Sequence, residues 1–215
     1  MNILGFAALI LAFLLSIIPI HHVSTKNWNR LASVPTSAII PVLWDGAIAC
    51  TAWRLNPTVL ITVDHCATDG TGQDIDQVIT PDGVLKVIAR DHEEDLAAIE
   101  TPVSHNANLI PSDIPLIVGQ SVAAIGYGGG NPTPFYTFGL VSNPRMKIQV
   151  NPTFIVDGLV IYGGFVSGMS GGPILNEDGL VVGVVKATGP PIGIYQDIGV
   201  GVPQDVFLKF LKTLP

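Results

Sequence analysis

Basic residues are scarce in this chain, and no run of them occurs anywhere in it. Lysine and arginine together number 10 against 17 acidic residues, which gives a net charge of −7. Because phosphate groups are bound by clustered lysine and arginine side chains, this balance argues against nucleic acid as a partner. The excess of acidic residues needs no specific partner, because a net charge keeps a protein soluble.

Cysteine is nearly absent, since Cys50 and Cys66 are the only two. No C-x-x-C pair accompanies the adjacent His65 and Cys66, so a zinc site is disfavoured. Nothing else in the chain indicates a metal or a cofactor. Internal repeats and low-complexity tracts are also lacking, and the roughly 190 residues after the N-terminal segment suit one domain.

No histidine follows residue 105, although a serine lies in a pattern typical of nucleophiles at residues 168–173. In this string, GMSGGP, glycines on both sides of Ser170 let the backbone turn sharply and bring N–H groups close to a substrate. The pattern also fits the nucleophile turn of α/β-hydrolases, but their histidine follows the serine, which excludes them here. A glycine-rich turn between two strands is the plainer alternative.

Two strings upstream supply a base and an acid. Residues 58–66, TVLITVDHC, form an apolar, β-branched run that predicts a buried strand ending at His65. Residues 91–99, DHEEDLAAI, place carboxylates before a second short apolar run. The resulting order of histidine, aspartate and serine is that of the chymotrypsin triad.

Together the three strings resemble the motifs T-A-x-H-C, D-L-A and G-x-S-G-G-P of trypsin-like, chymotrypsin-fold serine proteases. The resemblance implies that His65 is the general base, Asp95 its orienting carboxylate and Ser170 the nucleophile. It further implies an oxyanion hole formed by the main-chain N–H groups of Gly168 and Ser170.

Asp91 is a competing candidate for the acid, and His92 is one for the base. Leu-Ala follows Asp95, which favours it as the acid, and the pattern of a strand followed by histidine and cysteine belongs to His65.

Two positions depart from the family pattern. Asp64 replaces a small residue beside the base, where it would raise the imidazole pKa if it faced inward, although such residues more often point to solvent. Met169 replaces the aspartate that receives a newly cut N-terminus in zymogen-activated trypsins, so activation of that kind is not expected.

The resemblance covers residues 37–211 and is closest to the HtrA-type branch, on the strings at 119–128 and 137–142. It implies an all-β fold of two six-stranded antiparallel barrels with a C-terminal helix, in a domain over residues 37–215 without a PDZ domain. Composition agrees, because 23 glycines, 17 prolines and 13% charged residues are typical of short apolar strands joined by turns.

The family also places a disulfide where Cys50 and Cys66 lie, across the base of the histidine loop. Closing a loop of this length contributes about 3 kcal/mol in the chain-entropy model. A disulfide indicates an oxidising, extracytoplasmic location, whereas a pair of buried thiols in a reducing compartment is the alternative.

Residues 3–20 are free of charge and rich in Leu, Ile, Ala and Phe. We expect residues 1–22 to be a signal peptide or a signal-anchor transmembrane segment, and residues 23–36 a linker. Lys26 and Arg30 would hold the following chain in the cytoplasm by the positive-inside rule, contrary to the disulfide, to which we give more weight. The protein is therefore expected to be secreted or, if the segment is uncleaved, membrane-anchored.

Spacing from the serine places the base of the primary specificity pocket near Gly164 and its wall at Lys186, Ala187 and Thr188. Without an aspartate at the base, we expect a hydrophobic or small P1 residue, and we expect the lysine to be solvated. The sequence thus predicts a serine endopeptidase that cleaves polypeptides through an acyl-enzyme. A catalytically silent peptide-binding protein of the same fold and an esterase are the alternatives.

Overall fold

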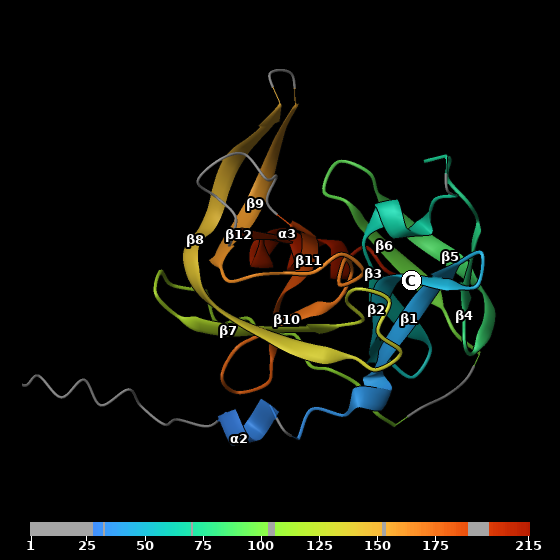
Figure 1. Cartoon of the computed structure of the whole chain (residues 1–215), viewed down its shortest axis with the longest axis horizontal. Coiled ribbons are helices and arrows are strands. Elements are labelled where there is room, and N and C mark those ends of the chain that lie inside the picture. Colours follow the sequence, from blue (N-terminus) through green and yellow to red (C-terminus); the bar gives the residue numbers. More distant parts are fainter. Residues whose placement is uncertain (1–27, 32, 70, 103–105, 152–153, 189–197) are drawn as a thin grey trace, which may run out of the picture.

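The computed structural model describes residues 28–31, 33–69, 71–102, 106–151, 154–188 and 198–215. These residues form two closed barrels, each of six antiparallel strands, that lie side by side (Figure 1). The expectation of an all-β fold with two such barrels and a C-terminal helix is confirmed. The expected signal or anchor segment lies outside the described residues. Among the helices that are described, none combines the length and apolarity needed to cross a membrane.

The first barrel has the strand order β1-β2-β3-β6-β5-β4. Its strands are β1 (Ile39–Trp44), β2 (Ala47–Asn56), β3 (Val59–Thr62), β4 (Gln77–Thr80), β5 (Gly83–Asp91) and β6 (Leu96–Glu100). Strand β3 is buried along its whole length because β2 and β6 pair with its two edges. This burial on both faces explains why its sequence, VLIT, does not alternate between apolar and charged residues.

The second barrel has the order β10-β11-β12-β9-β8-β7. Its strands are β7 (Ser121–Gly126), β8 (Phe135–Asn151), β9 (Phe154–Tyr162), β10 (Pro173–Leu175), β11 (Val181–Thr188) and β12 (Ile198–Val202). Strands β8 and β9 form a long hairpin, and the end of β8 and the start of β9 extend together away from the barrel (Figure 1). The connection between the barrels follows β6 and precedes β7.

Short helices complete the fold: α2 (Trp28–Leu31), η1 (Thr36–Ala38), η2 (Asp64–Ala67) and α3 (Gln204–Leu211). Helix α3 follows the last strand of the second barrel, and its apolar side chains join a buried cluster that holds residues of both barrels. The ring of Phe207 meets that of Trp53 edge to face, with centroids 5.8 Å apart. The helix therefore packs the two barrels together, which fixes the relative position of the loops between them.

Candidate active site

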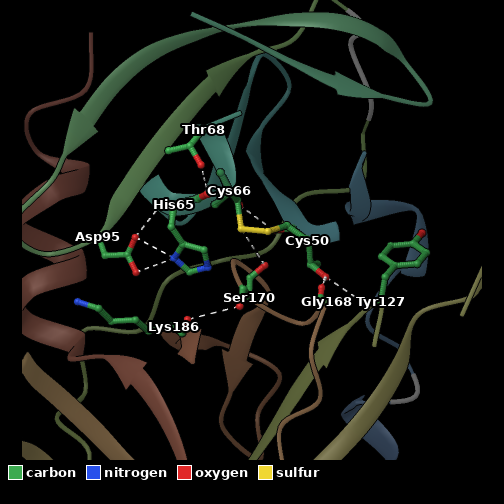
Figure 2. Close-up of a disulfide and its surroundings, with 11 residues drawn as sticks. Cys50, His65, Cys66, Thr68, Asp95, Tyr127, Gly168, Ser170 and Lys186 are labelled. Carbon is green, nitrogen blue, oxygen red and sulfur yellow. Dashed lines mark hydrogen bonds and ion pairs between the residues drawn. A yellow bond between two sulfur atoms is a disulfide. The ribbon is translucent and has the colours of Figure 1, made fainter. Parts of the chain in front are cut away.

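The three residues expected to form a triad come from separate elements that meet between the barrels. His65 lies on η2 directly after β3, and Asp95 lies in the turn before β6. Ser170 lies in the segment between β9 and β10 of the second barrel. Figure 2 shows the His65 ring between the Asp95 carboxylate and Ser170.

Asp95 holds both the ring and the backbone of His65. The Nδ1 atom lies 2.9 Å from Oδ2 and 3.1 Å from Oδ1, and the main-chain N–H donates to Oδ1 at 3.0 Å. The Thr68 hydroxyl donates to the His65 carbonyl oxygen at 2.8 Å. Since Nδ1 faces a carboxylate acceptor, the neutral ring carries its proton there and leaves Nε2 as the basic atom.

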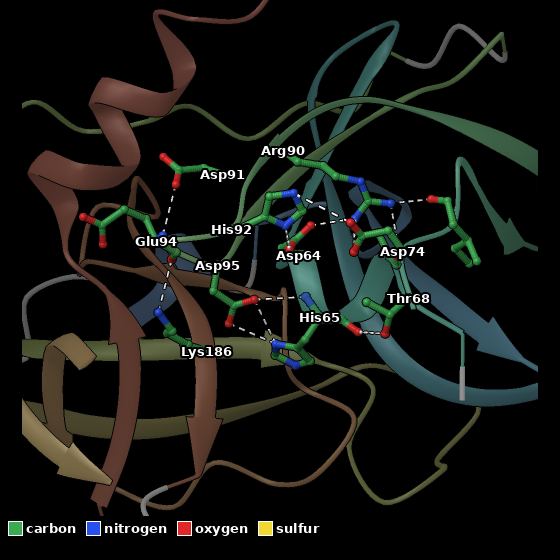
Figure 3. Close-up of polar contacts among 12 residues, drawn as sticks. Asp64, His65, Thr68, Asp74, Arg90, Asp91, His92, Glu94, Asp95 and Lys186 are labelled. Atoms are coloured by element: carbon green, nitrogen blue, oxygen red, sulfur yellow. Dashed lines mark hydrogen bonds and ion pairs between the residues drawn. The ribbon is translucent and has the colours of Figure 1, made fainter. Parts of the chain in front are cut away.

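The turn that presents Asp95 is tight and shaped by its own side chains. Asp95 adopts a φ of 60°, in the left-handed region that non-glycine residues rarely occupy. The Asp91 carboxylate accepts the N–H of Glu94 at 3.1 Å, which stabilises the turn (Figure 3). Asp91, the competing acid, thus supports the turn, whereas Asp95 is the acid that contacts His65.

The glycines around Ser170 are required by close backbone contacts. Gly168 and Gly171 have φ of +96° and +86°. A Cβ on Gly168 would lie 2.3 Å from the Tyr127 carbonyl oxygen, and one on Gly171 would lie 2.1 Å from that of Thr51. No side chain fits at these distances, so the glycines permit the loop to pass against both barrels.

Thr51, which belongs to none of the sequence motifs, holds this loop in place. Its hydroxyl donates to the Gly168 carbonyl oxygen at 2.8 Å and accepts the N–H of Tyr127 at 2.9 Å. Its main-chain N–H donates to the Ser170 carbonyl oxygen at 2.8 Å. The available signal was a threonine directly after Cys50 in an apolar strand, because a buried hydroxyl needs hydrogen-bond partners.

The atoms expected to act on a substrate are the Ser170 hydroxyl and two main-chain N–H groups. The hydroxyl donates to the Lys186 carbonyl oxygen at 3.4 Å. Within the described part of the chain, the N–H groups of Gly168 and Ser170 donate to no other protein atom. Met169 between them is fully buried in the core of the second barrel, where it takes the place of the aspartate of zymogen-activated trypsins.

The expected pocket residues occupy β11 and the segment after β9. Gly164 is exposed. Ala187 and Thr188 pair with β12 at Val200 and Gly199. Phe165 packs so closely on Gly199 that a Cβ there would lie 2.6 Å from its ring.

Lys186 differs from the solvated lysine that the sequence suggested. Its side chain is half-buried, and Nζ donates to the Glu94 carbonyl oxygen at 3.3 Å. It therefore reaches from the second barrel to the turn of the first barrel that carries Asp95 (Figure 3).

A disulfide joins Cys50 to Cys66, linking β2 to η2 with Cα atoms 6.0 Å apart. The Cys66 sulfur lies 3.7 Å from the Ser170 carbonyl oxygen. A ring nitrogen of His65 and both sulfurs lie within 4.8 Å of one another. Because the two sulfurs are bonded together, this group does not offer the thiolates of a zinc site.

Asp64, beside the expected base, points to neither His65 nor solvent. Its buried carboxylate accepts a hydrogen bond from Arg90 at 2.6 Å and contacts His92 Nδ1 at 2.7 Å. The hydrogen bond and charge of Asp64 raise the pKa of His92, with a smaller contribution from Asp74. His92, the competing candidate for the base, thus belongs to a separate ion-pair network. The Arg90 guanidinium lies against Asp64 and Asp74, where a metal cation would otherwise bind.

Sequence comparison identifies a trypsin-like peptidase domain over residues 50–184. Among curated proteins, the chain is 31% identical over 131 residues to a probable periplasmic serine endoprotease, DegP-like, from Rickettsia prowazekii. That match covers 60% of this chain and 24% of the relative, so the chain spans about a quarter of the relative's length.

Solved structures share the fold. The active form of the Rv3671c protease from M. tuberculosis superposes with a TM-score of 0.68 at 18% identity, covering 86% of this chain and 83% of that one. The HtrA-type protease AlgW with a tripeptide gives a TM-score of 0.67 at 19% identity, covering 87% and 63%. With the domain match spanning both barrels, these findings lead to one conclusion: the chain belongs to the trypsin-like peptidase family.

Proposed function

We propose that this protein is a serine endopeptidase whose catalytic residues are His65, Asp95 and Ser170. The observation that carries the proposal is the pairing of His65 Nδ1 with the Asp95 carboxylate, with the ring directed at Ser170 (Figure 2). A carboxylate bound at Nδ1 holds the tautomer that accepts a proton at Nε2 and stabilises the imidazolium that then forms. The family match supports the same reaction.

The proposed reaction begins when the Ser170 hydroxyl turns from the Lys186 carbonyl oxygen toward His65. Its Oγ attacks the peptide carbonyl carbon while Nε2 takes the hydroxyl proton, and the substrate oxygen becomes an oxyanion. His65 next gives that proton to the leaving amine as the C–N bond breaks. Water, deprotonated by the same nitrogen, then hydrolyses the acyl-enzyme and frees Ser170.

The oxyanion is proposed to bind the N–H groups of Gly168 and Ser170. Each such donor, aimed where charge develops, is typically worth about 3 kcal/mol of transition-state stabilisation. The Thr51 hydroxyl supports this role. It donates to the carbonyl oxygen of Gly168 and so holds the peptide group that lies between the two proposed donors.

Substrate selection is proposed to involve Gly164 and the β11 backbone at Lys186, Ala187 and Thr188. The Phe165 ring on Gly199 occupies space beside this wall, which favours a small or apolar P1 side chain over a long basic one. The peptide bound to AlgW supports a polypeptide as the substrate class.

We further propose an extracytoplasmic location, on the disulfide and on the periplasmic assignment of the Rickettsia relative. The domain would span residues 37–215, residues 23–36 would be a linker, and residues 1–22 a signal peptide or membrane anchor. Intact mass of the protein purified from its host, together with its partition between soluble and membrane fractions, tests the last assignment.

The test of the enzymatic proposal is labelling with a fluorophosphonate, which reacts only with activated serines. We expect one adduct on the wild type and none on Ser170→Ala, with the exposed Ser142→Ala on β8 labelled as the control. Cleavage of an internally quenched peptide panel with varied P1 residues should follow the same pattern. Folded wild-type protein that binds such peptides without labelling or cleaving would establish the silent peptide-binding alternative instead. Cleavage of simple esters alone would indicate the esterase.

A further inference from the structure

Lys186 sits at an irregularity of strand β11. Val185 pairs with Gly201 and Ala187 with Val200, so Lys186 is an extra residue between consecutive pairs, which is a β-bulge. A bulge leaves one residue outside the ladder and redirects its side chain, and such features are common beside active sites. Here the side chain is directed to the first barrel instead of along the face of β11.

The redirected lysine contacts both halves of the proposed site. Its Nζ donates to the Glu94 carbonyl oxygen at 3.3 Å, at the residue directly before Asp95. Its own carbonyl oxygen accepts the Ser170 hydroxyl at 3.4 Å. Figures 2 and 3 both show the ammonium beside the Asp95 carboxylate. Lys186 thus contacts the turn that carries Asp95 through its side chain and the Ser170 hydroxyl through its main chain.

We propose that Lys186 is a positioning residue of the triad, whose ammonium holds the Glu94–Asp95 turn so that the Asp95 carboxylate stays aligned with His65. This inference rests on the proposed function of the triad. The turn needs such support, because Asp95 occupies the left-handed region and is the last residue before β6. A hydrogen bond from a charged donor to a carbonyl is typically about twice as strong as one between neutral groups.

The charge of Lys186 acts among several others. Burial raises the pKa of Glu94, the Lys186 charge opposes this shift, and Asp91 and Asp157 add to it while Arg145 opposes it. The Asp95 carboxylate contacts Nδ1 of the His65 ring. Asp64, the other nearby carboxylate, is engaged by Arg90 and His92.

The experiment compares wild type, Lys186→Met and Lys186→Arg, with the exposed Lys209→Met on α3 as the matched control. Steady-state kinetics are measured on one quenched peptide. For Lys186→Met we expect kcat to fall about 10-fold or more and KM to stay within about 2-fold of wild type. The arginine variant, which keeps a charged donor, should recover most of kcat, and the control should match wild type.

A second readout does not depend on turnover. The proton shared by His65 Nδ1 and Asp95 should give a low-field proton NMR resonance in the wild type that broadens or shifts in Lys186→Met and is restored in Lys186→Arg. A wild-type kcat and a wild-type resonance in Lys186→Met would overturn the inference, as would an arginine variant no better than the methionine one. Failure of the proposed function is distinct, because wild type would then neither cleave peptide nor react with fluorophosphonate, while the resonance would still report on Lys186.

Discussion

At the scale of single residues, the hydroxyl of Thr51 links the two barrels through hydrogen bonds. It lies in β2 of the first barrel, yet its partners are Gly168 and Tyr127 of the second. Because the hydroxyl is fully buried, water cannot replace either partner if the hydroxyl is removed. The contact therefore combines a structural contribution with an effect on the loop that contains the proposed oxyanion donors.

Replacing Thr51 with valine keeps its shape and removes both hydrogen bonds. We expect the free energy of unfolding to fall by about 1–3 kcal/mol, because a buried carbonyl and a buried N–H lose their partner. We also expect kcat to fall more than KM rises, since the Gly168 peptide is less firmly held. Urea unfolding and steady-state kinetics measure the two effects, and Thr51→Ser, which keeps the hydroxyl, is the control. A valine variant with unchanged kcat would contradict the assigned role.

The residues of the proposed triad could be predicted because each lies in a short, contiguous pattern, such as the strand that ends at His65. The contacts of Thr51 and Lys186 could not, because their partners lie 117 and 92 residues away along the chain. The partner of Lys186 is moreover a main-chain carbonyl, which leaves no side-chain signature. Its bulge depends on how β11 pairs with β12, and no local pattern in VVKAT marks it.

At the scale of elements, η2 is bound to β5 by a charged network. Asp64 on η2 contacts Arg90 at the end of β5 and His92 just after it. Arg90 also donates to the carbonyl oxygen of Ala67 at 2.8 Å. The helix that carries His65 is thereby held by Arg90 and His92 in addition to the contacts of Asp95 (Figure 3).

This network predicts a specific pH dependence. The pKa of His92 should lie above its ordinary value of about 6.5, and Asp64→Asn should lower it far more than Asp74→Asn. The pairing stabilises the fold fully below about pH 6.5, and this contribution is lost as pH rises through the raised folded pKa. Two-dimensional NMR titration of the His92 ring measures the shift. An unshifted wild-type value, or equal effects of the two substitutions, would contradict it.

The prediction of strands succeeded where burial leaves a periodic or continuous apolar pattern, as in β3. The two-barrel closure was inferred from a family resemblance rather than from periodicity, and the structure confirms it. The pairing of distant strands such as β7 with β10 depends on contacts between separate segments, which the local pattern does not specify.

At the scale of the whole molecule, Gln204 ties the connection between the barrels to the C-terminal helix. Its amide nitrogen donates to the carbonyl oxygens of Ser112 and Ile114 at 2.7 and 2.9 Å, and its oxygen accepts the N–H of Leu116 at 3.2 Å. Three hydrogen bonds from one buried side chain thus hold a segment in which Ile114 is exposed and Leu116 is buried.

Gln204→Ala should therefore lower the free energy of unfolding by about 2–4 kcal/mol, because three backbone groups lose their partner, two of them in buried hydrogen bonds. Gln120→Ala is the matched control, since the side chain of that glutamine accepts an exposed hydrogen bond from the N–H of Ile117. It should cost under about 1 kcal/mol. Chemical denaturation of both variants provides the comparison. Equal losses would show that the Gln204 contacts contribute no more than a surface bond.

The order of the elements along the chain has a consequence for the protein's own biosynthesis. The proposed base and acid belong to the first barrel, the proposed nucleophile belongs to the second, and α3 follows both barrels along the chain. Domains form as the chain emerges, so a nascent polypeptide holds His65 and Asp95 long before Ser170 can reach them. A nascent copy that lacks the second barrel therefore lacks the proposed triad, and we expect it to hydrolyse neither its neighbours nor itself.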